Sequence, residues 1–173
     1  MRIALLGGTG DIGADLALRW GRDMDHEVVA VPPEYAVETV ATDLSSTAIL
    51  VSPAVSMVRD TSGFHYARPE TGSIAEAIAA AAPEDVSVVS AFQNLAARAL
   101  STLDDDLALD VVVTGDDADA KTTVSGFVNE IDGLRALDAG GLANSAEVES
   151  VTPLLINLAM NNDGLHDLGV RFQ

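Results

Sequence analysis

The chain has 173 residues, of which 48% are hydrophobic, and it contains no cysteine. This length and composition favour one globular domain with a real core, and they exclude disulfides, thiol catalysis and cysteine-ligated metals. The 27 acidic residues against 9 basic ones give a net charge of −18, which argues strongly against a nucleic-acid partner.

The acidic residues are spread along the chain, and Lys121 is the only lysine. Such a surface is typical of proteins that stay soluble in molar salt, where the Debye length shrinks to about 3 Å. Charge or proline interrupts every apolar run before the roughly 18 residues of a membrane span, and the short apolar stretch after Arg2 is unlike a secretory signal. We therefore expect a cytoplasmic protein without a membrane partner. A halophilic cytosol is the preferred interpretation, and an ordinary acidic protein or an acidic docking surface is the alternative.

The first thirteen residues, MRIALLGGTGDIG, place a short apolar run directly against a glycine-rich turn. In a dinucleotide-binding unit, the first glycine allows the tight turn, the second lets the backbone approach a pyrophosphate, and the third permits close helix packing. Gly8, Gly10 and Gly13 have this spacing. The helix expected from Asp11 to Arg22 directs its backbone N–H groups toward the phosphates. The pattern predicts nucleotide binding, with a purely structural turn as the alternative.

Apolar strands alternate with helical stretches along the chain, which predicts an α/β fold with a mostly parallel sheet. The candidate strands are Arg2–Leu6, Glu27–Val31, Ala48–Ser52, Val86–Ala91, Asp110–Thr114 and Leu134–Asp138. A helix is expected over Ser73–Ala82, because Ser73 and Glu76 form a capping box and Pro83 ends the segment. Another helix is expected over Asp117–Glu130. In the range 53–72 the apolar residues do not recur with the period of a helix or a strand, so this range is predicted to be a long loop.

The pattern changes from about Ala143, where the sequence predicts one helix of about twenty residues and then a glycine-broken tail. Pro153 is expected to kink this helix. An apolar stripe is formed by Leu154, Leu155, Leu158 and Ala159. A stripe that a monomer leaves uncovered indicates a homo-oligomer, either a homodimer or a homotetramer. We expect a dinucleotide-binding domain over residues 1–141 and a small C-terminal helical segment over residues 142–173.

Several longer segments occur in a characteristic order, namely GGTGDIG, VPPEYA, SPAVSM with RDTSGFHY, SAFQNLAARALSTL, TGDDADAK and EIDGLRALDAGGLANSAEVESVTPLLINL. The series spans nearly the entire chain and resembles the NADPH-dependent coenzyme F420 (F-420) reductases of archaea. The acidic, lysine-poor composition resembles a haloarchaeal member. The resemblance implies a Rossmann-like, doubly wound fold and an oxidoreductase that transfers a hydride between NADP(H) and this 8-hydroxy-5-deazaflavin.

The resemblance implies a site made for cofactor binding, because the two cofactors perform the hydride transfer. No catalytic acid or base and no metal ligand is expected. The implied positions are Gly8, Thr9, Gly10, Asp11, Ile12 and Gly13 for the pyrophosphate, Val31 and Pro32 beside the nicotinamide, and Val55, Gln93, Ala97 and Leu168 in the deazaflavin pocket. For the apolar members, structural packing is an equally good local explanation. Gln93 stands where relatives usually carry histidine, so it can make a polar contact but cannot titrate.

The sequence departs from the family pattern after Val29. In relatives, the stretch that resembles HEVV is followed by Gly-Ser-Arg, which holds the 2′-phosphate of NADP, and then by further elements before Val-Pro-Pro. Here HEVV continues directly into AVPPEYA, so one or two βα units, roughly forty residues at ordinary element lengths, are absent. We therefore expect a shortened sheet, a strand that joins two elements, and no NADP discriminator.

An alternative interpretation makes Glu34 the acidic residue that binds the ribose in NAD enzymes, about 20 residues beyond the glycine turn. Pro32 and Pro33 intervene, and Glu34 suits the first turn of a helix, where negative charge is favourable. Three functions stay open. They are an active oxidoreductase, a deazaflavin- or nucleotide-binding protein, and an inactive remnant that lacks the 2′-phosphate site.

The remaining polar candidates are histidines and arginines. Solvated or hydrogen-bonded roles are expected for His26, His65 and His166, because they lack the spacing of metal ligands. Arg59 and Arg68 flank the predicted long loop. They are candidates to meet the phosphate or polyglutamate tail of the deazaflavin, and ordinary surface arginines are the alternative.

Overall fold

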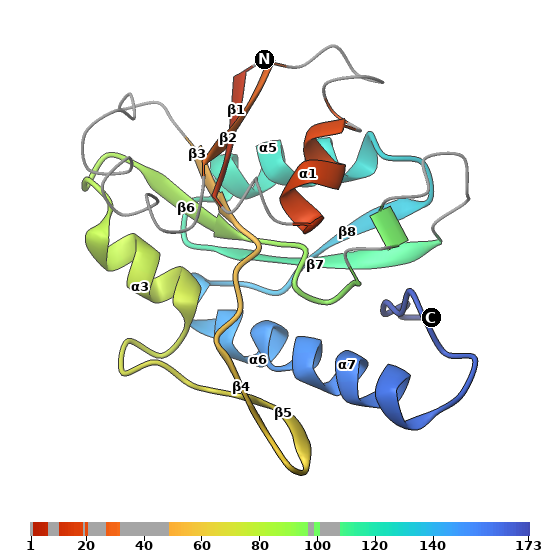
Figure 1. Cartoon of the computed structure of the whole chain (residues 1–173). Helices are drawn as coiled ribbons and strands as arrows, with labels where there is room; N and C mark the ends of the chain where they lie inside the picture. The colour runs from red at the N-terminus through yellow and green to blue at the C-terminus, as the bar shows by residue number, and fades with distance from the viewer. Residues whose placement is uncertain are drawn as a thin grey trace.

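The computed structural model describes residues 2–6, 11–18, 20, 27–31, 49–96, 99–100 and 108–173. The strands are β1 (Arg2–Leu6), β2 (Glu27–Val31), β3 (Ile49–Ser52), β4 (Met57–Asp60), β5 (Gly63–Tyr66), β6 (Ser87–Ser90), β7 (Leu109–Gly115) and β8 (Leu134–Asp138). The helices are α1 (Asp11–Leu18), α3 (Ile74–Ala81), α5 (Ala118–Asn129), the short 3₁₀-helix η3 (Leu142–Asn144), α6 (Ser145–Glu149) and α7 (Val151–Asn161). Strands and helices alternate along most of the chain (Figure 1).

The main sheet has six strands in the order β2-β1-β3-β6-β7-β8. All neighbouring strands in it run parallel except β6 and β7, which are antiparallel. This confirms the predicted α/β fold with a mostly parallel, Rossmann-like sheet. The chain goes from β1 to β2 on one side and later to β3 on the other side of β1, so the direction of winding reverses there. β2 pairs with β1 along its whole length and forms an edge of the sheet, so the residues expected to lie in the joined strand do form a strand.

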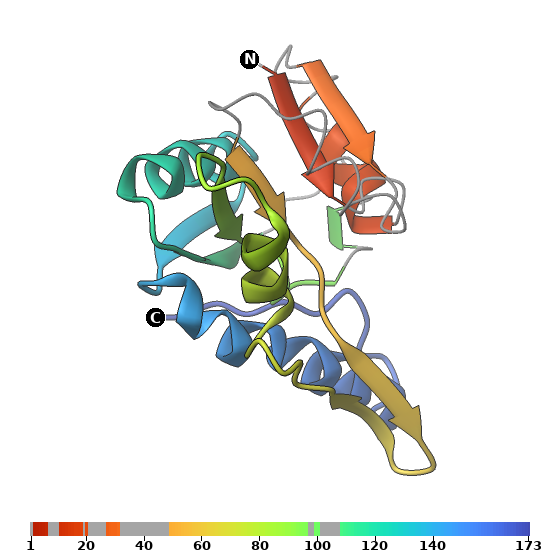
Figure 2. The same cartoon turned by 90° about the vertical axis from the view of Figure 1, so that its left-hand side faces the viewer.

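Helices cover both faces of the sheet, as a doubly wound fold requires (Figures 1 and 2). One core cluster packs Val51 and Val89 together with residues of α1 and α5. The second packs Leu50 and Val88 together with residues of α3. Adjacent residues of a strand point to opposite faces, so β3 and β6 contribute to both clusters.

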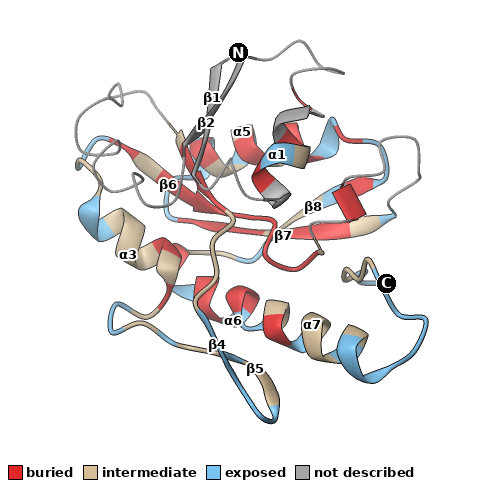
Figure 3. Cartoon of the chain, viewed as in Figure 1, coloured by how far each residue is buried: buried red, intermediate tan, exposed pale blue. Residues whose placement is uncertain are grey.

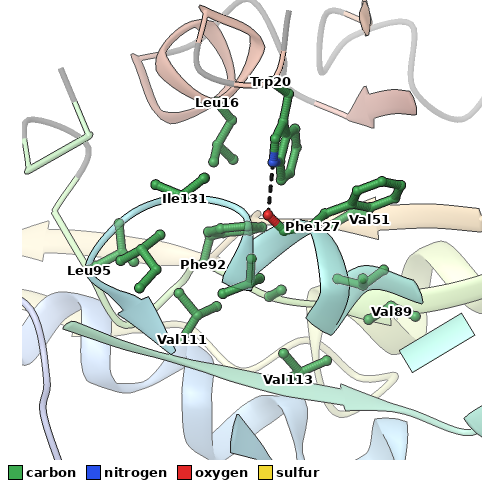
Figure 4. Close-up of a cluster of buried hydrophobic side chains, with 14 of the residues drawn as sticks. Leu16, Trp20, Val51, Val89, Phe92, Leu95, Val111, Val113, Phe127 and Ile131 are labelled. Atoms are coloured by element: carbon green, nitrogen blue, oxygen red, sulfur yellow. Dashed lines mark hydrogen bonds between the residues drawn. The ribbon is translucent and has the colours of Figure 1, made fainter. Parts of the chain in front are cut away.

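Trp20 joins the N-terminal unit to the rest of the core (Figure 4). Its side chain is fully buried, and its Nε1 donates to the carbonyl oxygen of Phe127 at 3.0 Å. The indole ring lies edge-on to the ring of Phe92, with 5.7 Å between centroids. Leu16 of α1 is fully buried in the same cluster. The predicted continuation of α1 to Arg22 falls mostly outside the described residues.

The start of α3 confirms the predicted cap, and the start of α5 has a side-chain cap as well. Ser73 precedes α3, and its Oγ accepts from the backbone N of Glu76 at 3.0 Å. The same hydroxyl donates to the Glu76 carboxylate at 2.9 Å. Asp117 caps α5 by accepting from the backbone N–H groups of Asp119 and Ala120. Side-chain caps of this kind satisfy the unpaired N–H groups of a first turn.

A β-hairpin lies within the range 53–72, so the prediction of a long irregular loop is wrong. β4 and β5 pair antiparallel, with Asp60 opposite Gly63. The Asp60 carboxylate accepts from the backbone N of Ser62 at 2.7 Å and from its hydroxyl at 2.6 Å, and Gly63 has a φ of 129°, which glycine tolerates. Both strands have only four residues and β4 is exposed throughout, so no alternation of apolar and polar residues indicates them.

The C-terminal region contains η3, α6 and α7 in place of the single predicted helix. The chain leaves α6 after Glu149 and enters α7 at Val151. Pro153 lies in the first turn of α7, has no N–H, and in a continuous helix its ring would clash with the carbonyl of Glu149. The proline therefore separates two helices rather than kinking one. The tail then returns to the sheet, where the backbone N of Asp110 donates to the oxygen of Val170 at 2.8 Å.

Burial is concentrated in the sheet and in the helical faces turned toward it (Figure 3). In the described part of the chain, no helix is long and apolar enough to cross a membrane. The division into residues 1–141 and residues 142–173 stays a prediction.

Candidate functional site

The strands β2, β1, β3 and β6 end at the same level of the sheet. Leu6 pairs with Val31, the pairing of Leu5 with Val51 places Ser52 beside Leu6, and Ser52 pairs with Ser90. In open parallel sheets, ligands bind outside the carboxyl ends of the strands, at the point where the winding reverses. This edge, beside β1, is the candidate site.

One half of the site lies at the start of α1. The helix begins at Asp11, directly after the glycine-rich sequence, as the motif predicts. Gly13 is buried, which agrees with close packing at the third glycine. Among the sequence-predicted positions, those outside the described residues are Gly8, Thr9, Gly10, Pro32 and Ala97, and Glu34 lies outside them too. Of Asp11, Ile12 and Val31, only the backbone is described.

Gln93 occupies the other half, just after β6. Its Nε2 donates to the carbonyl oxygen of Ser52 at 2.7 Å and to the Oγ of Ser90 at 2.6 Å. All three residues are buried. The Oε1 of Gln93 and the hydroxyl of Ser52 have no hydrogen-bond partner among the described residues. An unpaired buried polar atom costs about 1–3 kcal/mol, so these two atoms indicate a place for another polar group.

Backbone strain precedes Gln93. Phe92 has a φ of 78°, a conformation that costs a bulky residue about 1–3 kcal/mol and that clusters at functional sites. Its side chain is fully buried against Trp20. Core packing thus offsets the strain, and the turn directs Gln93 toward the ends of β3 and β6.

The structure brings Leu168 next to the segment that follows β6. The backbone N of Ala96 donates to the oxygen of Leu168 at 2.7 Å, and Leu95 forms an isolated β-bridge with Gly169. Val55 lies half-buried between β3 and β4. Three positions predicted for the deazaflavin pocket are described. Val55 follows β3, Gln93 follows β6, and Leu168 lies against the segment after β6.

Further hydrogen bonds from β7 and α7 hold the segment that follows β6. The Nδ2 of Asn94 donates to the Asp110 oxygen at 2.6 Å, and its Oδ1 accepts from the backbone N of Val112 at 3.1 Å. The Oγ1 of Thr152 in α7 donates to the Gln93 carbonyl oxygen at 2.5 Å. β7 and α7 thus hold the backbone around Gln93 in place.

An ion pair holds the C-terminal tail beside the segment that contains Gln93. The fully buried Asp110 accepts from the Nε and Nη2 of Arg135 at 2.7 and 2.8 Å, and from the backbone N of Phe172 at 2.6 Å. Arg135 Nη2 also donates to the Phe172 oxygen at 2.7 Å. The guanidinium hydrogen bonds hold the pKa of Asp110 below its ordinary value, with a smaller opposing effect of burial.

The hairpin at the end of β3 is anchored by Glu149. Its Oε2 accepts from the Tyr66 hydroxyl at 2.9 Å and from the backbone N of Ile74 at 3.1 Å, and its Oε1 accepts from the backbone N of Ala75 at 3.2 Å. Burial raises the pKa of Glu149, despite these hydrogen bonds. Burial, followed by the Glu149 hydrogen bond, also raises the pKa of Tyr66. One carboxylate therefore joins the hairpin to the start of α3.

The sequence analysis did not identify four buried polar residues near the site, namely Ser52, Ser90, Asn94 and Glu149. The two serines could have been found, because each ends an apolar run at the corresponding position of β3 or β6. The sequence offers no comparable signal for Asn94 and Glu149. His65 and His166 are exposed, with His65 bonded to Ser62 and His166 beside Asp167, as expected for solvated or hydrogen-bonded histidines. His26 lies outside the described residues. The described residues contain no group of three His, Asp, Glu or Cys that could hold a metal ion.

Three archaeal proteins, each an F420-dependent NADP reductase, are similar to this chain. That of Methanocaldococcus jannaschii is 31% identical over 207 aligned residues, covering 91% of this chain and 92% of the relative. Those of Methanothermobacter thermautotrophicus and Methanothermobacter marburgensis are each 30% identical over 219 residues, covering 99% of this chain and 94% and 97% of the relatives. These 219 positions exceed the 173 residues of the chain by 46, which agrees with the predicted internal shortening.

Two solved structures share the fold. One, from Arthrobacter sp. FB24 and provisionally assigned as an F420-dependent NADP reductase, has a TM-score of 0.68 at 19% identity and covers 90% of this chain and 92% of its own. The other, the hypothetical protein SMa0349 of Sinorhizobium meliloti, has a TM-score of 0.60 at 19% identity, with coverages of 84% and 86%. At this identity, the likeness concerns the fold alone. No protein-family model matches the chain.

Proposed function

The chain belongs to the family of F420-dependent NADP reductases, and on this premise we propose that it transfers a hydride between NADPH and coenzyme F420. The observation that carries the proposal is an identity of 30% or more along nearly the whole of both chains. The sheet edge supports it, because Asp11 and Val31 on the nucleotide side and Val55 and Gln93 on the deazaflavin side follow or end strands of that edge. When bound, the nicotinamide and the deazaflavin supply the hydride donor and acceptor, and the protein supplies binding, distance and a dry pocket.

On the nucleotide side, we propose that the glycine-rich turn and the first residues of α1 hold the pyrophosphate. The proposed residues are Gly8, Thr9, Gly10, Asp11, Ile12 and Gly13. The start of α1 supports this, because a helix N-terminus presents unpaired N–H groups to an anion. Val31 and Pro32 are proposed to border the nicotinamide, and the position of Val31 at the end of β2 supports that role.

On the deazaflavin side, we propose Gln93 as the polar contact. The unpartnered Oε1 is a hydrogen-bond acceptor, and it fits a ligand N–H or O–H group. Val55, Ala97 and Leu168 are proposed as apolar walls that exclude water and orient the ring. No protein acid or base is assigned.

The experiment that tests the proposal is an initial-rate assay in concentrated salt with NADPH and F420 together. We expect loss of the F420 absorbance only when NADPH is present, and the reverse with reduced F420 and NADP. Absence of turnover in both directions, with a protein that unfolds cooperatively, would contradict the proposal.

A second candidate function is binding of the deazaflavin without efficient NADP binding. The 46 positions by which the alignment exceeds the chain favour it, because the sequence places the shortening on the nucleotide side. Calorimetric titration separates the two candidates. Heat of binding for both cofactors supports the reductase, whereas heat for F420 alone supports the binding protein. A folded protein that neither cofactor stabilises against heat would be the inactive remnant.

We also propose a homo-oligomer, a homodimer or a homotetramer, assembled through α7. On this helix Leu154 is 55% exposed and Leu158 40%. They lie four residues apart and so share one face, and exposed apolar side chains gathered on one face are typical of interfaces. Light scattering measures the mass directly, and Leu158→Glu is expected to shift it toward the monomer.

The location proposed for the protein is the cytoplasm. A reaction between two dissolved coenzymes requires access to the pools of both, and this requirement supports the proposal. Recovery of the activity in the cytoplasmic fraction of the source cells would test it, and recovery elsewhere would contradict it.

A further inference from the structure

The two strands of the hairpin place alternate residues on opposite faces. Arg59 lies opposite Phe64 in the ladder. A hydrogen bond from the backbone N of Ala67 to the oxygen of Ser56, at 2.9 Å, continues this ladder toward β3. Residues 59, 57 and 55 of the outgoing strand therefore share a face with residues 64, 66 and 68 of the returning strand.

That face carries two arginines and one position of the proposed ring pocket. In the continued register, Arg68 lies opposite Val55, and Arg59 lies on the same face. An antiparallel strand rises about 3.4 Å per residue, so Arg59 is about 14 Å farther than Val55 from the base of the hairpin. The face thus leads outward from the proposed ring site.

Charge also distinguishes the hairpin from the rest of the chain. Arg59 and Arg68 are exposed, and among the described residues neither lies within ion-pair distance of a carboxylate, whereas Lys121 and Arg135 both do. The range 53–69 contains these two arginines and a single acidic residue, Asp60, in a chain of net charge −18. Of the further carboxylates, Glu70 follows the range, and Glu149 is fully buried and bonded to Tyr66. The exposed side chains of the hairpin are therefore less acidic than the rest of the chain.

Local contacts orient both side chains. The guanidinium carbon of Arg59 lies 5.3 Å from the centroid of the Phe64 ring, and the Nε of Arg68 donates to the Gly72 oxygen at 3.1 Å. A guanidinium has five N–H donors, so these contacts leave donors for an anion. The hairpin is itself held on α7, because the side chain of Asn157 bonds both the N and the O of Phe64, at 2.9 and 2.7 Å.

We propose that Arg59 and Arg68 form a subsite for the anionic tail of F420, the phosphodiester and carboxylate groups that follow the deazaflavin ring. The inference rests on the proposed function, and it assigns the hairpin to the tail of the coenzyme. Guanidinium groups bind phosphate and carboxylate through paired, charge-assisted hydrogen bonds. The subsite contributes to binding and leaves the hydride-transfer step unchanged.

The experiment compares two substrates, F420 with its full tail and a deazaflavin that ends at the ribityl group. For the double variant Arg59→Gln, Arg68→Gln, we expect the KM for full F420 to rise about 3- to 10-fold, in line with exposed ion pairs. The kcat and the KM for the tailless deazaflavin should stay unchanged. The control is Thr122→Glu on the exposed surface of α5. It lowers the net charge by one unit, as each of the two arginine substitutions does, without touching the hairpin.

An unchanged KM for full F420 overturns the subsite, and so does an equal rise for both substrates. An equal rise in Thr122→Glu shows an effect of net charge and also overturns it. If the wild type does not turn over, calorimetric binding of the same two deazaflavins decides the matter. Tighter binding of the full coenzyme that disappears in the double variant supports the subsite, and equal binding refutes it. If neither deazaflavin binds, both the proposed function and the subsite are wrong.

Discussion

The two sides of the candidate site are held in the fold in different ways. The nucleotide side, built from β1, α1 and β2, joins the rest of the sheet through the pairing of β1 with β3 and through the burial of Leu16 and Trp20. The deazaflavin side is held by side-chain and backbone bonds from β3, β7, α7 and the C-terminal tail. The strained Phe92 lies where these two sides meet.

This difference bears on the shortening that the sequence predicts on the nucleotide side. β2 completes a parallel ladder with β1 at the edge of the sheet, so a shortening there is compatible with the strands around Gln93. The two sides should therefore respond separately to mutation, and the following variants test that separation.

The largest effect is expected for Trp20→Ala. Removing a fully buried tryptophan leaves a cavity and costs about 3–5 kcal/mol of unfolding free energy. The Phe127 oxygen also loses its Trp20 donor. We expect NADPH affinity to fall much more than F420 affinity, as measured by denaturant unfolding and by calorimetry of both cofactors. Trp20→Phe, which keeps most of the volume, is the control at about 1–2 kcal/mol. Equal losses of both affinities in the alanine variant would contradict the separation.

A smaller loss, about 2 kcal/mol at neutral pH, is expected for Asp110→Asn, because the neutral amide has one acceptor oxygen and cannot accept both hydrogen bonds from Arg135. This variant should weaken F420 binding and spare NADPH binding, the reverse of the tryptophan variant.

The pH dependence of this variant follows from the lowered pKa of Asp110. A carboxyl whose pKa is lower in the folded state stabilises the fold above its ordinary value of 3.8, and this stabilisation disappears as the pH falls through the lowered pKa. The difference in unfolding free energy between wild type and Asp110→Asn should therefore be constant near neutrality and shrink below pH 3.8. A difference that grows on acidification would show that the ion pair is not its source.

The predicted loss of the 2′-phosphate site concerns only the nucleotide side. Without the Gly-Ser-Arg discriminator, we expect the kcat/KM values for NADPH and NADH to differ by no more than about tenfold, equivalent to about 1.4 kcal/mol. Steady-state kinetics with each nucleotide measure the ratio. A much stronger preference for NADPH would mean that other residues bind the 2′-phosphate.

The smallest kinetic effect is expected at Gln93 on the deazaflavin side. Gln93→Leu removes the Oε1 acceptor, so kcat/KM for F420 should fall about fivefold, or about 1 kcal/mol, with little change for NADPH. It also removes the Nε2 donor of two buried hydrogen bonds, so a loss of about 1–3 kcal/mol in unfolding free energy accompanies the kinetic effect. Gln93→His introduces a polar group that titrates, so the kcat/KM of this variant for F420 should gain a pH dependence that the wild type lacks. Identical pH profiles for wild type and Gln93→His would argue against contact with the deazaflavin.

Local sequence patterns predicted the regular elements well and the tertiary contacts poorly. The apolar runs located most strands, and the capping box of Ser73 and Glu76 located α3, because these signals are local. The hairpin was missed because its strands are short and exposed, and the break at Ser150 because one proline can either kink or end a helix. The burial of Glu149 and the strain at Phe92 depend on partners distant in the chain, so no sequence window contains them.

The central claim is that NADPH and F420 meet at one edge of the sheet and exchange a hydride directly. The most direct measurement uses NADPH carrying deuterium at the transferred position and follows the label by mass spectrometry or NMR. The account predicts that the label appears in the reduced deazaflavin without dilution by solvent hydrogen. Reduced deazaflavin that carries solvent hydrogen instead, or no reduction by a folded protein, would contradict it.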